Sequence, residues 1–552
     1  MKVLFFAVNC SYSHTSLAAW CLRSTLDESV WDWQTLEVTT KDEPSKVMSR
    51  ILEAKPDVIA ATLYLFNRDY VAGILRAVRA LLPDSRIVVG GPECLGENVG
   101  IAGDNGFADV AVRGEGERAF PALLERWRGR QGWSDISGLC GVAAPGGYRD
   151  NGTAEWVEDL DSIPVFYERE LLGFRKPFIQ LETSRGCGNG CLFCTSRHTV
   201  LRFHSEARIR DHLKAIVAAG IKEVRIVDRT FNEDRVRALM LTRLFRDEFP
   251  RLRFHLEIEP ARFNQALADE FSQAAPGRFH LEVGIQTLNP SVCAIIERGA
   301  TVNRTLDGLK RLCDLATVEV HVDLIAGLPG SRPSDILADL EAVMAFRPAE
   351  IQLERLKLLP GTPFSLTPAQ WGLIANAAPP YQVLQTPTLS PDDLAQSDRM
   401  SKIIDWYYNT PELHAVVIEA VIIDPGFLAR FESWGRERMR FDVRPSLESR
   451  FQSLNTFIQL EIAANLPAAD KFERVAHRLC YRWFQLGFSA RKGLRPAVLW
   501  KQEIPPEAVL LEGNAEARVS RKWQVELDSP HLFCYGSGSR GERAVVAVYR
   551  LR

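Results

Sequence analysis

Apolar runs and helical periodicities alternate along the first part of the chain. Short apolar runs predict buried strands, and the longer segments between them repeat apolar residues at helical spacing. Strands separated by helices are typical of βαβ units on a parallel sheet, so we predict a doubly wound, Rossmann-like domain over residues 1–145. The predicted strands are 2–8, 33–38, 57–62, 86–89 and 108–112, and the predicted helices are 15–26, 44–54, 68–82 and 116–127.

The alternation restarts after a loop-rich segment. Glycine pairs and Pro164 favour a linker over residues 146–172. Six strands with five helices between them then predict a partial (β/α)6 TIM-like barrel over residues 173–364. The predicted strands are 178–183, 223–228, 253–258, 279–285, 318–325 and 350–358, and the helices are 205–219, 233–249, 261–274, 303–315 and 334–346.

The last part of the chain, residues 365–552, predicts a mainly helical accessory domain. Pro379-Pro380 punctuates its start, and segments 398–408 and 471–488 have helical patterns. Residues 524–526 and 544–549 predict a terminal hairpin. We favour a helical lid over the barrel as its role.

Composition narrows the class of protein. A net charge of −3 gives no reason to expect nucleic acid or an acidic membrane as a partner. No apolar run approaches the roughly 20 residues that span a bilayer, and the apolar start predicts a strand rather than a signal peptide. Eleven cysteines at irregular spacings argue against a disulfide framework, which fits a protein of the reducing cytoplasm. We also expect a monomer.

Three cysteines follow the first strand of the predicted barrel. Cys187, Cys191 and Cys194 have C-x3-C-x2-C spacing, and soft sulfur ligands suit iron and zinc. Three thiolates are one short of the set that closes a [4Fe–4S] cluster, so one iron would be left to bind a small molecule. The alternative is a structural zinc site with His198 or His204 as its fourth ligand.

The position of the cysteines favours the cluster. They lie at the C-terminal face of the predicted barrel, where barrel sites are built. This arrangement, with Phe193 before the last cysteine, resembles the radical S-adenosylmethionine superfamily. The resemblance implies that the open iron chelates S-adenosylmethionine and that one electron breaks a carbon–sulfur bond to release a 5′-deoxyadenosyl radical.

Polar residues at the other strand ends are candidates to hold S-adenosylmethionine. A carboxylate accepts hydrogen bonds from ribose hydroxyls, and an amide both donates and accepts. For each carboxylate a salt bridge or a helix cap is the alternative. Asp228 ends the second strand, and we predict that it contacts the methionine amine or the substrate as a catalytic residue. The strand ends offer Glu257 and Glu259 as cofactor candidates. Resemblance to the family's ribose-contacting and adenine-contacting segments adds Glu282, Gln286, Asp323 and Leu358, and the cysteine motif adds Phe193.

The loops after the strands of the first domain form a second candidate site. Ligands of such sheets bind beyond the carboxyl ends of the strands, although each loop taken singly could be an ordinary turn. These loops resemble the cobalamin-binding domain that precedes the barrel in many radical S-adenosylmethionine enzymes. The expected contacts are Asn9, Ser11, His14, Thr15, Thr62, Tyr64, Leu65, Gly90, Gly91, Pro92, Glu93, Gly114, Glu115, Gly116 and Glu117.

The resemblance departs from other cobalamin proteins at one motif. The D-x-H-x-x-G sequence that supplies a histidine below cobalt is absent. Cobalamin is therefore expected base-off, with its lower face near Tyr64 and Leu65 and no firm protein ligand. His14 is either a binding contact or a satisfied polar residue at a helix start.

Together the resemblances imply a reaction class. Methylcobalamin would methylate an unactivated carbon of a small-molecule or natural-product substrate, and a flavodoxin or ferredoxin would supply electrons. The same subfamily includes enzymes of rearrangement, cyclisation, oxidation and sulfur insertion, which remain alternatives. A corrinoid or metal sensor without turnover is an alternative of another class.

Overall fold

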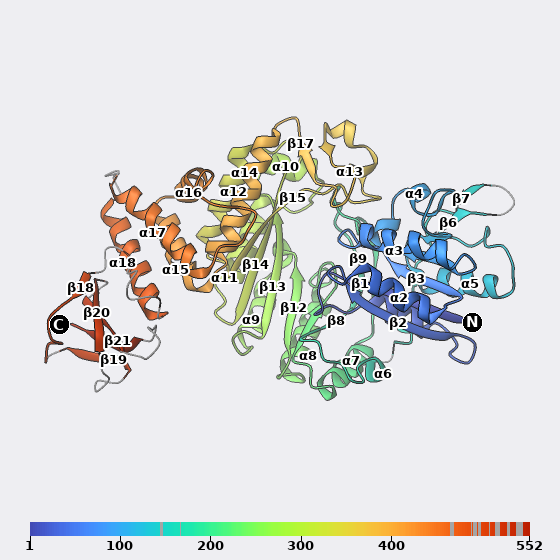
Figure 1. Cartoon of the computed structure of the whole chain (residues 1–552), viewed down its shortest axis with the longest axis horizontal. Helices are drawn as coiled ribbons and strands as arrows, with labels where there is room; N and C mark the ends of the chain where they lie inside the picture. Colours follow the sequence, from blue (N-terminus) through green and yellow to red (C-terminus); the bar gives the residue numbers. More distant parts are fainter. Residues whose placement is uncertain are drawn as a thin grey trace. The chain divides into compact units, whose positions relative to one another are not determined.

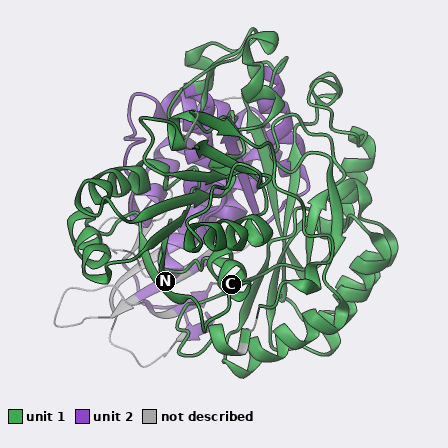
Figure 2. Cartoon of the chain, turned by 90° about the vertical axis from the view of Figure 1, so that its right-hand side faces the viewer, with its two compact units in different colours: residues 1–333, 355–394 green, residues 334–354, 395–552 purple. Residues whose placement is uncertain are grey.

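A computed structural model describes residues 1–143, 147–165, 167–463, 469–486, 488, 494, 498–506, 508–513, 519–526, 530–536 and 545–551. The chain divides into two compact units (Figure 2). The first contains Met1–Pro333 and Arg355–Leu394, and the second contains Ser334–Glu354 and Ala395–Arg552. Gly146, Gly487 and Ala544, which fall in predicted segments, lie outside the described residues.

The first unit begins with a seven-stranded sheet in the order β2-β1-β3-β4-β5-β6-β7 (Figure 1). Its first five strands pair in parallel, which confirms the predicted Rossmann-like domain. The strands are β1 (Lys2–Asn9), β2 (Asp32–Thr39), β3 (Val58–Thr62), β4 (Arg86–Gly90) and β5 (Val110–Val112). The helices are α1 (Leu17–Ser24), α2 (Pro44–Ala54), α3 (Arg68–Leu81), α4 (Val99–Ala102) and α5 (Gly116–Arg128).

Two further strands extend this sheet beyond the prediction. β6 (Leu139–Val142) and β7 (Tyr148–Asp150) add an antiparallel edge, and β7 falls in the predicted linker. Both are short, and β7 is mostly exposed, so neither carries the continuous apolar run that marks a central parallel strand. The rest of the predicted linker contains the short helix α6 (Tyr167–Glu170).

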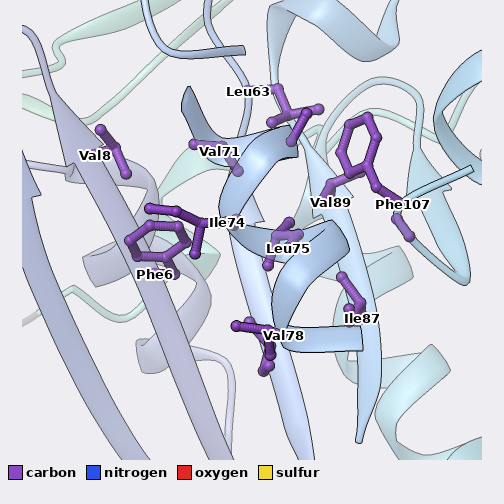
Figure 3. Close-up of a cluster of buried hydrophobic side chains, with 14 of the residues drawn as sticks. Phe6, Val8, Leu63, Val71, Ile74, Leu75, Val78, Ile87, Val89 and Phe107 are labelled. Carbon is purple, nitrogen blue, oxygen red and sulfur yellow. The ribbon is translucent and has the colours of Figure 1, made fainter. Parts of the chain in front are cut away.

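Alternate residues of β1 supply two cores, one on each face of the sheet. Phe6 and Val8 pack with Ile74 and Leu75 of α3 on one face (Figure 3). Phe5 packs on the other face, in the core that contains Phe120 and Leu123 of α5. Helices on both faces explain why the central strands β1, β3 and β4 are apolar along most of their length.

A second sheet has the order β15-β14-β13-β12-β11-β8, the six strands predicted for the barrel, and all of them except most of β15 belong to the first unit. Neighbouring strands from β8 to β14 pair in parallel. The strands are β8 (Ile179–Leu181), β11 (Glu223–Ile226), β12 (Arg253–Ile258), β13 (Phe279–Gln286), β14 (Val318–Ala326) and β15 (Glu350–Arg355). The helices between them are α7 (Glu206–Ala218), α8 (Arg235–Asp247), α9 (Gln265–Ser272), α10 (Pro290–Ile295), α11 (Val302–Cys313) and α12 (Pro333–Ala345).

A hairpin that the sequence pattern did not predict carries the three cysteines. β9 (Ser184–Cys187) and β10 (Thr199–Phe203) pair antiparallel as a sheet of their own after β8. Further along, β16 (Ile374–Ala375) and β17 (Val383–Gln385) form another two-stranded sheet. The short helix α13 (Pro363–Leu366) precedes them.

The second unit contains most of α12 and β15, and the rest of it is helical and then antiparallel. Its other helices are α14 (Pro391–Ile403), which continues into a π-helical turn (Ile404–Tyr408), α15 (Pro411–Ile423), α16 (Phe427–Gly435), α17 (Leu447–Ala463) and α18 (Ala469–Gln485). A five-stranded sheet follows in the order β18-β20-β21-β22-β19. Its strands are β18 (Val498–Trp500), β19 (Val509–Gly513), β20 (Val519–Glu526), β21 (Pro530–Gly536) and β22 (Val545–Arg550).

The predicted terminal hairpin is wrong in its pairing. β20 and β22 both exist, but each pairs with β21, which lies between them. Among the described residues, no helix combines the length and the apolar composition that crossing a bilayer requires.

Candidate active site

Strand alternation aims polar side chains at the inner face of the barrel. In β13, Phe279, Leu281 and Val283 are fully buried, whereas Glu282 and Gln286 point to the other face and stay partly open. These side chains join the cysteines in one cavity of about 170 Å³. The residues predicted for S-adenosylmethionine that line it are Phe193, Glu257, Glu259, Glu282, Gln286 and Asp323.

The hairpin β9–β10 delivers all three cysteines to that cavity. Cys187 and Cys191 are buried and Cys194 is half-buried, and burial raises the pKa of the last two thiols. All three are free thiols, so a soft donor set is available for an iron–sulfur cluster. Gly186 fits this hairpin because its φ is +103° and a Cβ there would lie 2.2 Å from the Val200 carbonyl oxygen.

The two histidines considered for zinc lie elsewhere. His204 is buried with its Nδ1 3.0 Å from an oxygen of Asp161. His198 lines a different cavity, together with residues of the loop 188–190. Neither histidine lines the cysteine cavity, so the geometry favours the cluster over zinc.

Asp228 does not reach the cavity. It is 2 % exposed, and its Oδ1 accepts hydrogen bonds from the backbone N–H groups of Thr183 at 2.7 Å and Ser184 at 2.9 Å. Its Oδ2 accepts from both hydroxyls. Burial raises the pKa of Asp228 although these donors favour the charged form. The carboxylate is fully used in holding the start of β9, so the structure gives it a positioning role rather than the predicted contact with methionine or substrate.

Two carboxylates of the cavity differ in charge state. Burial raises the pKa of Glu257 to about 7, and Glu282 adds to that effect. The hydrogen bond from His255, whose Nε2 lies 2.9 Å from Glu282 Oε2, lowers the pKa of Glu282. Near neutral pH the cavity therefore contains one carboxylate held ionised and another close to its titration point.

Arg298 is a cavity residue that the sequence pattern did not indicate. It follows α10, a helix absent from the prediction, and its guanidinium lies 2.7 Å from Glu259 Oε2. The same side chain donates to the Gly284 carbonyl and lies 3.9 Å from the Cys191 sulfur. Placing this cation beside the thiols would have required predicting α10 and the turn that follows it.

Of two other residues predicted to contact S-adenosylmethionine, Gln286 lines the cavity and Leu358 does not. Gln286 has a φ of +68°, next to a register shift in the pairing of β13 with β14. Such a strained backbone conformation is common at functional sites. Leu358 does not line the cavity: it is buried, and its N–H donates to the Tyr381 carbonyl at 3.0 Å.

A second cavity, of about 380 Å³, lies at the carboxyl ends of the first sheet. Its apolar floor comes from the sheet and from α5, and includes Phe5, Ala60, Val88, Val112 and Phe120, none of which was predicted. The predicted residues that line it are Thr62, Tyr64, Gly90, Gly91, Pro92, Gly114, Glu115, Gly116 and Glu117.

Glycine turns let the backbone approach a ligand in this cavity. Gly91 has a φ of +98°, and a Cβ there would lie 2.7 Å from the Leu63 carbonyl oxygen. No histidine lines this cavity in the part of the chain that the structure describes. An apolar floor with glycine rims fits the large, flat ring of a corrinoid.

The remaining residues predicted for cobalamin lie outside the cavity lining: Asn9, Ser11, His14, Thr15, Leu65 and Glu93. The His14 Nδ1 lies 2.9 Å from the Ser11 hydroxyl, and burial lowers its pKa. Glu93 is 3 % exposed and accepts a hydrogen bond of 2.6 Å from the Tyr381 hydroxyl. His14 therefore fits the satisfied polar residue rather than the binding contact.

Comparisons with known proteins match three parts of the chain. Residues 181–343 match the Radical SAM superfamily and residues 4–124 match the B12 binding domain. Residues 369–504 match a protein family of unknown function, DUF4080.

Curated relatives match parts of the chain. An uncharacterized methyltransferase of Pyrococcus horikoshii is 26% identical over 286 residues, which are 48% of this chain and 59% of that protein. Hopanoid C-3 methylase of Methylococcus capsulatus is 31% identical over 176 residues, 30% of this chain and 34% of that protein. A tRNA-2-methylthio-N(6)-dimethylallyladenosine synthase of Paenarthrobacter aurescens is 23% identical over 309 residues, 54% of this chain and 56% of that protein. The chain thus spans less than two thirds of the length of each of these relatives.

Solved structures share the fold. The cobalamin-dependent S-adenosylmethionine radical enzyme OxsB superposes with a TM-score of 0.60 at 15% identity, covering 88% of this chain and 83% of that chain. The radical S-adenosylmethionine methyltransferase TsrM of Kitasatospora setae superposes with a TM-score of 0.54 at 19% identity, covering 71% and 79%.

Proposed function

We propose that this chain, which belongs to the radical S-adenosylmethionine superfamily and carries an N-terminal B12-binding domain, is a cobalamin-dependent methyltransferase. The observation that carries the proposal is the pair of cavities in one compact unit. One is lined by three free thiols and the other by glycine turns over an apolar floor.

The cofactors supply the reactive groups. When bound, a [4Fe–4S] cluster supplies the electron that cleaves S-adenosylmethionine to a 5′-deoxyadenosyl radical, and methylcobalamin supplies the methyl group. Cys187, Cys191 and Cys194 would hold the cluster, because they are the soft donors that converge on the barrel cavity.

The other cavity residues would bind and orient S-adenosylmethionine. Ionised Glu282 and half-open Asp323 offer acceptors for ribose hydroxyls, and Gln286 offers both donor and acceptor. Arg298, held by Glu259, places a cation beside the thiols, where it would meet the methionine carboxylate. Glu257 is the group able to hold or release a proton near neutral pH.

The glycine cavity would hold the corrinoid base-off. Thr62, Tyr64 and the two glycine turns line its rim, and the apolar floor excludes water from the enclosed part of the ligand. Tyr64 is the lining residue expected near the lower face of cobalt. Its ring stacks on Phe66 at a centroid distance of 5.4 Å, which fixes its orientation.

The substrate is a small molecule or natural product with an unactivated carbon, and a flavodoxin or ferredoxin supplies electrons to a monomeric cytoplasmic enzyme. We assign residues 1–145 to cobalamin binding, 146–172 to a linker, 173–364 to the barrel and 365–552 to an accessory domain. The sheet edge β6–β7 extends the first of these domains to about Asp150.

Product analysis tests the proposal. Protein reconstituted anaerobically with iron, sulfide and hydroxocobalamin is incubated with dithionite, S-adenosylmethionine and a panel of candidate substrates. S-adenosylhomocysteine formed together with a methylated product supports methyl transfer. 5′-Deoxyadenosine with no methylated product would point instead to rearrangement, cyclisation or oxidation, and a thiomethylated product to sulfur insertion.

A further inference from the structure

Five charged side chains form one ion-pair cluster between the glycine cavity and the cysteine hairpin. Arg185 of β9 lies at the centre: its Nη2 is 2.6 Å from Glu117, its Nη1 3.3 Å from Glu115 and its Nε 2.9 Å from Glu182. Arg202 of β10 donates two hydrogen bonds to Glu115, at 2.6 and 3.0 Å. We call these residues the Arg185 cluster.

The Arg185 cluster is largely withdrawn from water. The exposed fractions of the side chains are 14% for Arg185, 9% for Arg202, 9% for Glu117, 18% for Glu115 and 19% for Glu182. Charges in such a setting interact far more strongly than on the surface, and removing one partner leaves the others unpaired. Because two arginines face three carboxylates, losing either arginine would leave buried negative charge without a cation.

The cluster changes the role of two predicted cobalamin contacts. Glu115 and Glu117 were predicted as cobalamin contacts and line the cavity, and the carboxylates of both are engaged by arginines of the hairpin. Glu115 also accepts the Val157 backbone N–H at 2.9 Å. The acidic side chains of this turn therefore fasten the cavity rim to β9 and β10.

Arg185 belongs to both sites at once. Its side chain lines the glycine cavity together with Glu115, Glu117 and Glu182. Its backbone stands two residues before Cys187, and Gly186 between them packs against the Val200 carbonyl with no room for a Cβ. The Cys187 N–H in turn donates to the Thr199 hydroxyl at 3.0 Å. A shift of Arg185 is therefore passed along a short, tightly packed segment to the first cysteine.

We infer that Arg185 is a positioning residue that couples the corrinoid site to the cluster site, so that each cofactor strengthens the binding of the other. The inference rests on the proposed function only in taking a corrinoid and an iron–sulfur cluster as the two ligands. A corrinoid in the glycine cavity would fix Arg185 and the rim carboxylates, and thereby favour the backbone arrangement that presents Cys187. By linkage, cluster assembly would favour corrinoid binding by the same factor.

The test is a binding measurement that needs no turnover. Hydroxocobalamin is titrated, with detection of its visible absorbance, into cluster-free protein and into protein loaded with the cluster under anaerobic conditions. For the unmodified chain we expect loading of the cluster to tighten hydroxocobalamin binding by about 5-fold to 150-fold, the usual range of coupling between sites.

Three variants locate the coupling. In Arg185→Gln the ratio of the two dissociation constants should fall to about 1. In Arg185→Lys the ratio should lie between 1 and the value of the unmodified chain, because lysine keeps the positive charge but not the planar guanidinium that binds several carboxylates at once. Glu117→Gln removes a single partner and should also lower the ratio. Thermal unfolding and iron content identify any variant that fails to fold, and Glu117→Gln then carries the test.

The matched control is Arg246→Gln. Arg246 of α8 lies 2.6 Å from Glu270 of α9, and the exposed fractions of the two side chains are 15% and 11%. The substitution therefore removes an ion pair of similar exposure that lines neither cavity. The ratio should remain that of the unmodified chain.

Each contrary outcome has one meaning. If the unmodified chain binds hydroxocobalamin with the same affinity in both forms, or if Arg185→Gln keeps the full ratio, the inference is wrong and the proposed function stands. If the unmodified chain binds no hydroxocobalamin in either form, the proposed function itself fails and the inference with it.

Discussion

Substitutions of Asp228 can distinguish a positioning role of this residue from a catalytic one. Because its carboxylate accepts four hydrogen bonds from Thr183 and Ser184 and lines neither cavity, it stabilises the turn into β9. Asparagine has nearly the same shape. Its oxygen can accept both backbone N–H groups, while its amide donates to the two hydroxyls after they rotate.

The structure sets the size of the two effects. Asp228→Ala leaves two buried backbone N–H groups without an acceptor, at about 1–3 kcal/mol each, so we expect a loss of about 2–6 kcal/mol in the free energy of unfolding. Asp228→Asn loses only the charge of the acceptor, and we expect about 1–2 kcal/mol. Asp228→Asn should keep the cluster and most of the S-adenosylmethionine cleavage, whereas Asp228→Ala should lose both.

The assay combines two readouts. Urea unfolding of cluster-free protein, followed by tryptophan fluorescence, gives the free energies, and 5′-deoxyadenosine released per cluster gives cleavage. Asp234→Asn is the matched control, because Asp234 caps α8 six residues further along and asparagine is an equally good cap. An Asp228→Asn protein with normal stability and iron content, but with cleavage reduced 100-fold or more, would refute the positioning role and restore the contact with methionine or substrate.

Gly91→Ala should weaken hydroxocobalamin binding at least tenfold without changing cluster content, because its Cβ would meet the Leu63 carbonyl; equal binding would contradict this. The unfolded chain loses the Glu257 proton above a pKa of about 4.3, whereas the folded cluster-free protein keeps it to about pH 7, so stability should fall as the pH rises across this window. Urea titrations should show that slope disappear in Glu257→Gln, and an unchanged slope would exclude Glu257 as its source. Tyr381→Phe removes the donor to buried Glu93 and should cost about 1–3 kcal/mol by the same titration, with no change in iron content.

Much of the fold could be predicted because it depends on local pattern. Central strands of the first sheet carry apolar runs, strands of the second sheet alternate apolar and polar residues, and α2 and β12 begin and end at the predicted residues. Short antiparallel pairs carry no such signal. The hairpin β9–β10 is partly exposed and polar, and its pairing depends on residues on either side of the cysteine loop.

In the candidate site, too, features set by local sequence could be predicted and contacts between distant residues could not. Spacing was enough to bring Cys187, Cys191 and Cys194 to one cavity, because a loop of eight residues fixes them together. The direction of a side chain was not predictable: Asp228, two residues past the end of β11, faces Thr183, and Glu93 faces Tyr381, a residue far along the chain. Arg185 shows the limit most clearly, since its partners Glu115 and Glu117 lie at the start of α5, about 70 residues earlier in the chain.

One measurement tests the central claim most directly: the nucleoside products of S-adenosylmethionine in chain loaded with cluster and cobalamin, compared with Cys187→Ala/Cys191→Ala/Cys194→Ala protein and with cobalamin-free protein. The account predicts 5′-deoxyadenosine that requires the three cysteines, and S-adenosylhomocysteine that requires cobalamin. Cleavage that survives the loss of the cysteines, or S-adenosylhomocysteine that forms equally without cobalamin, would contradict it.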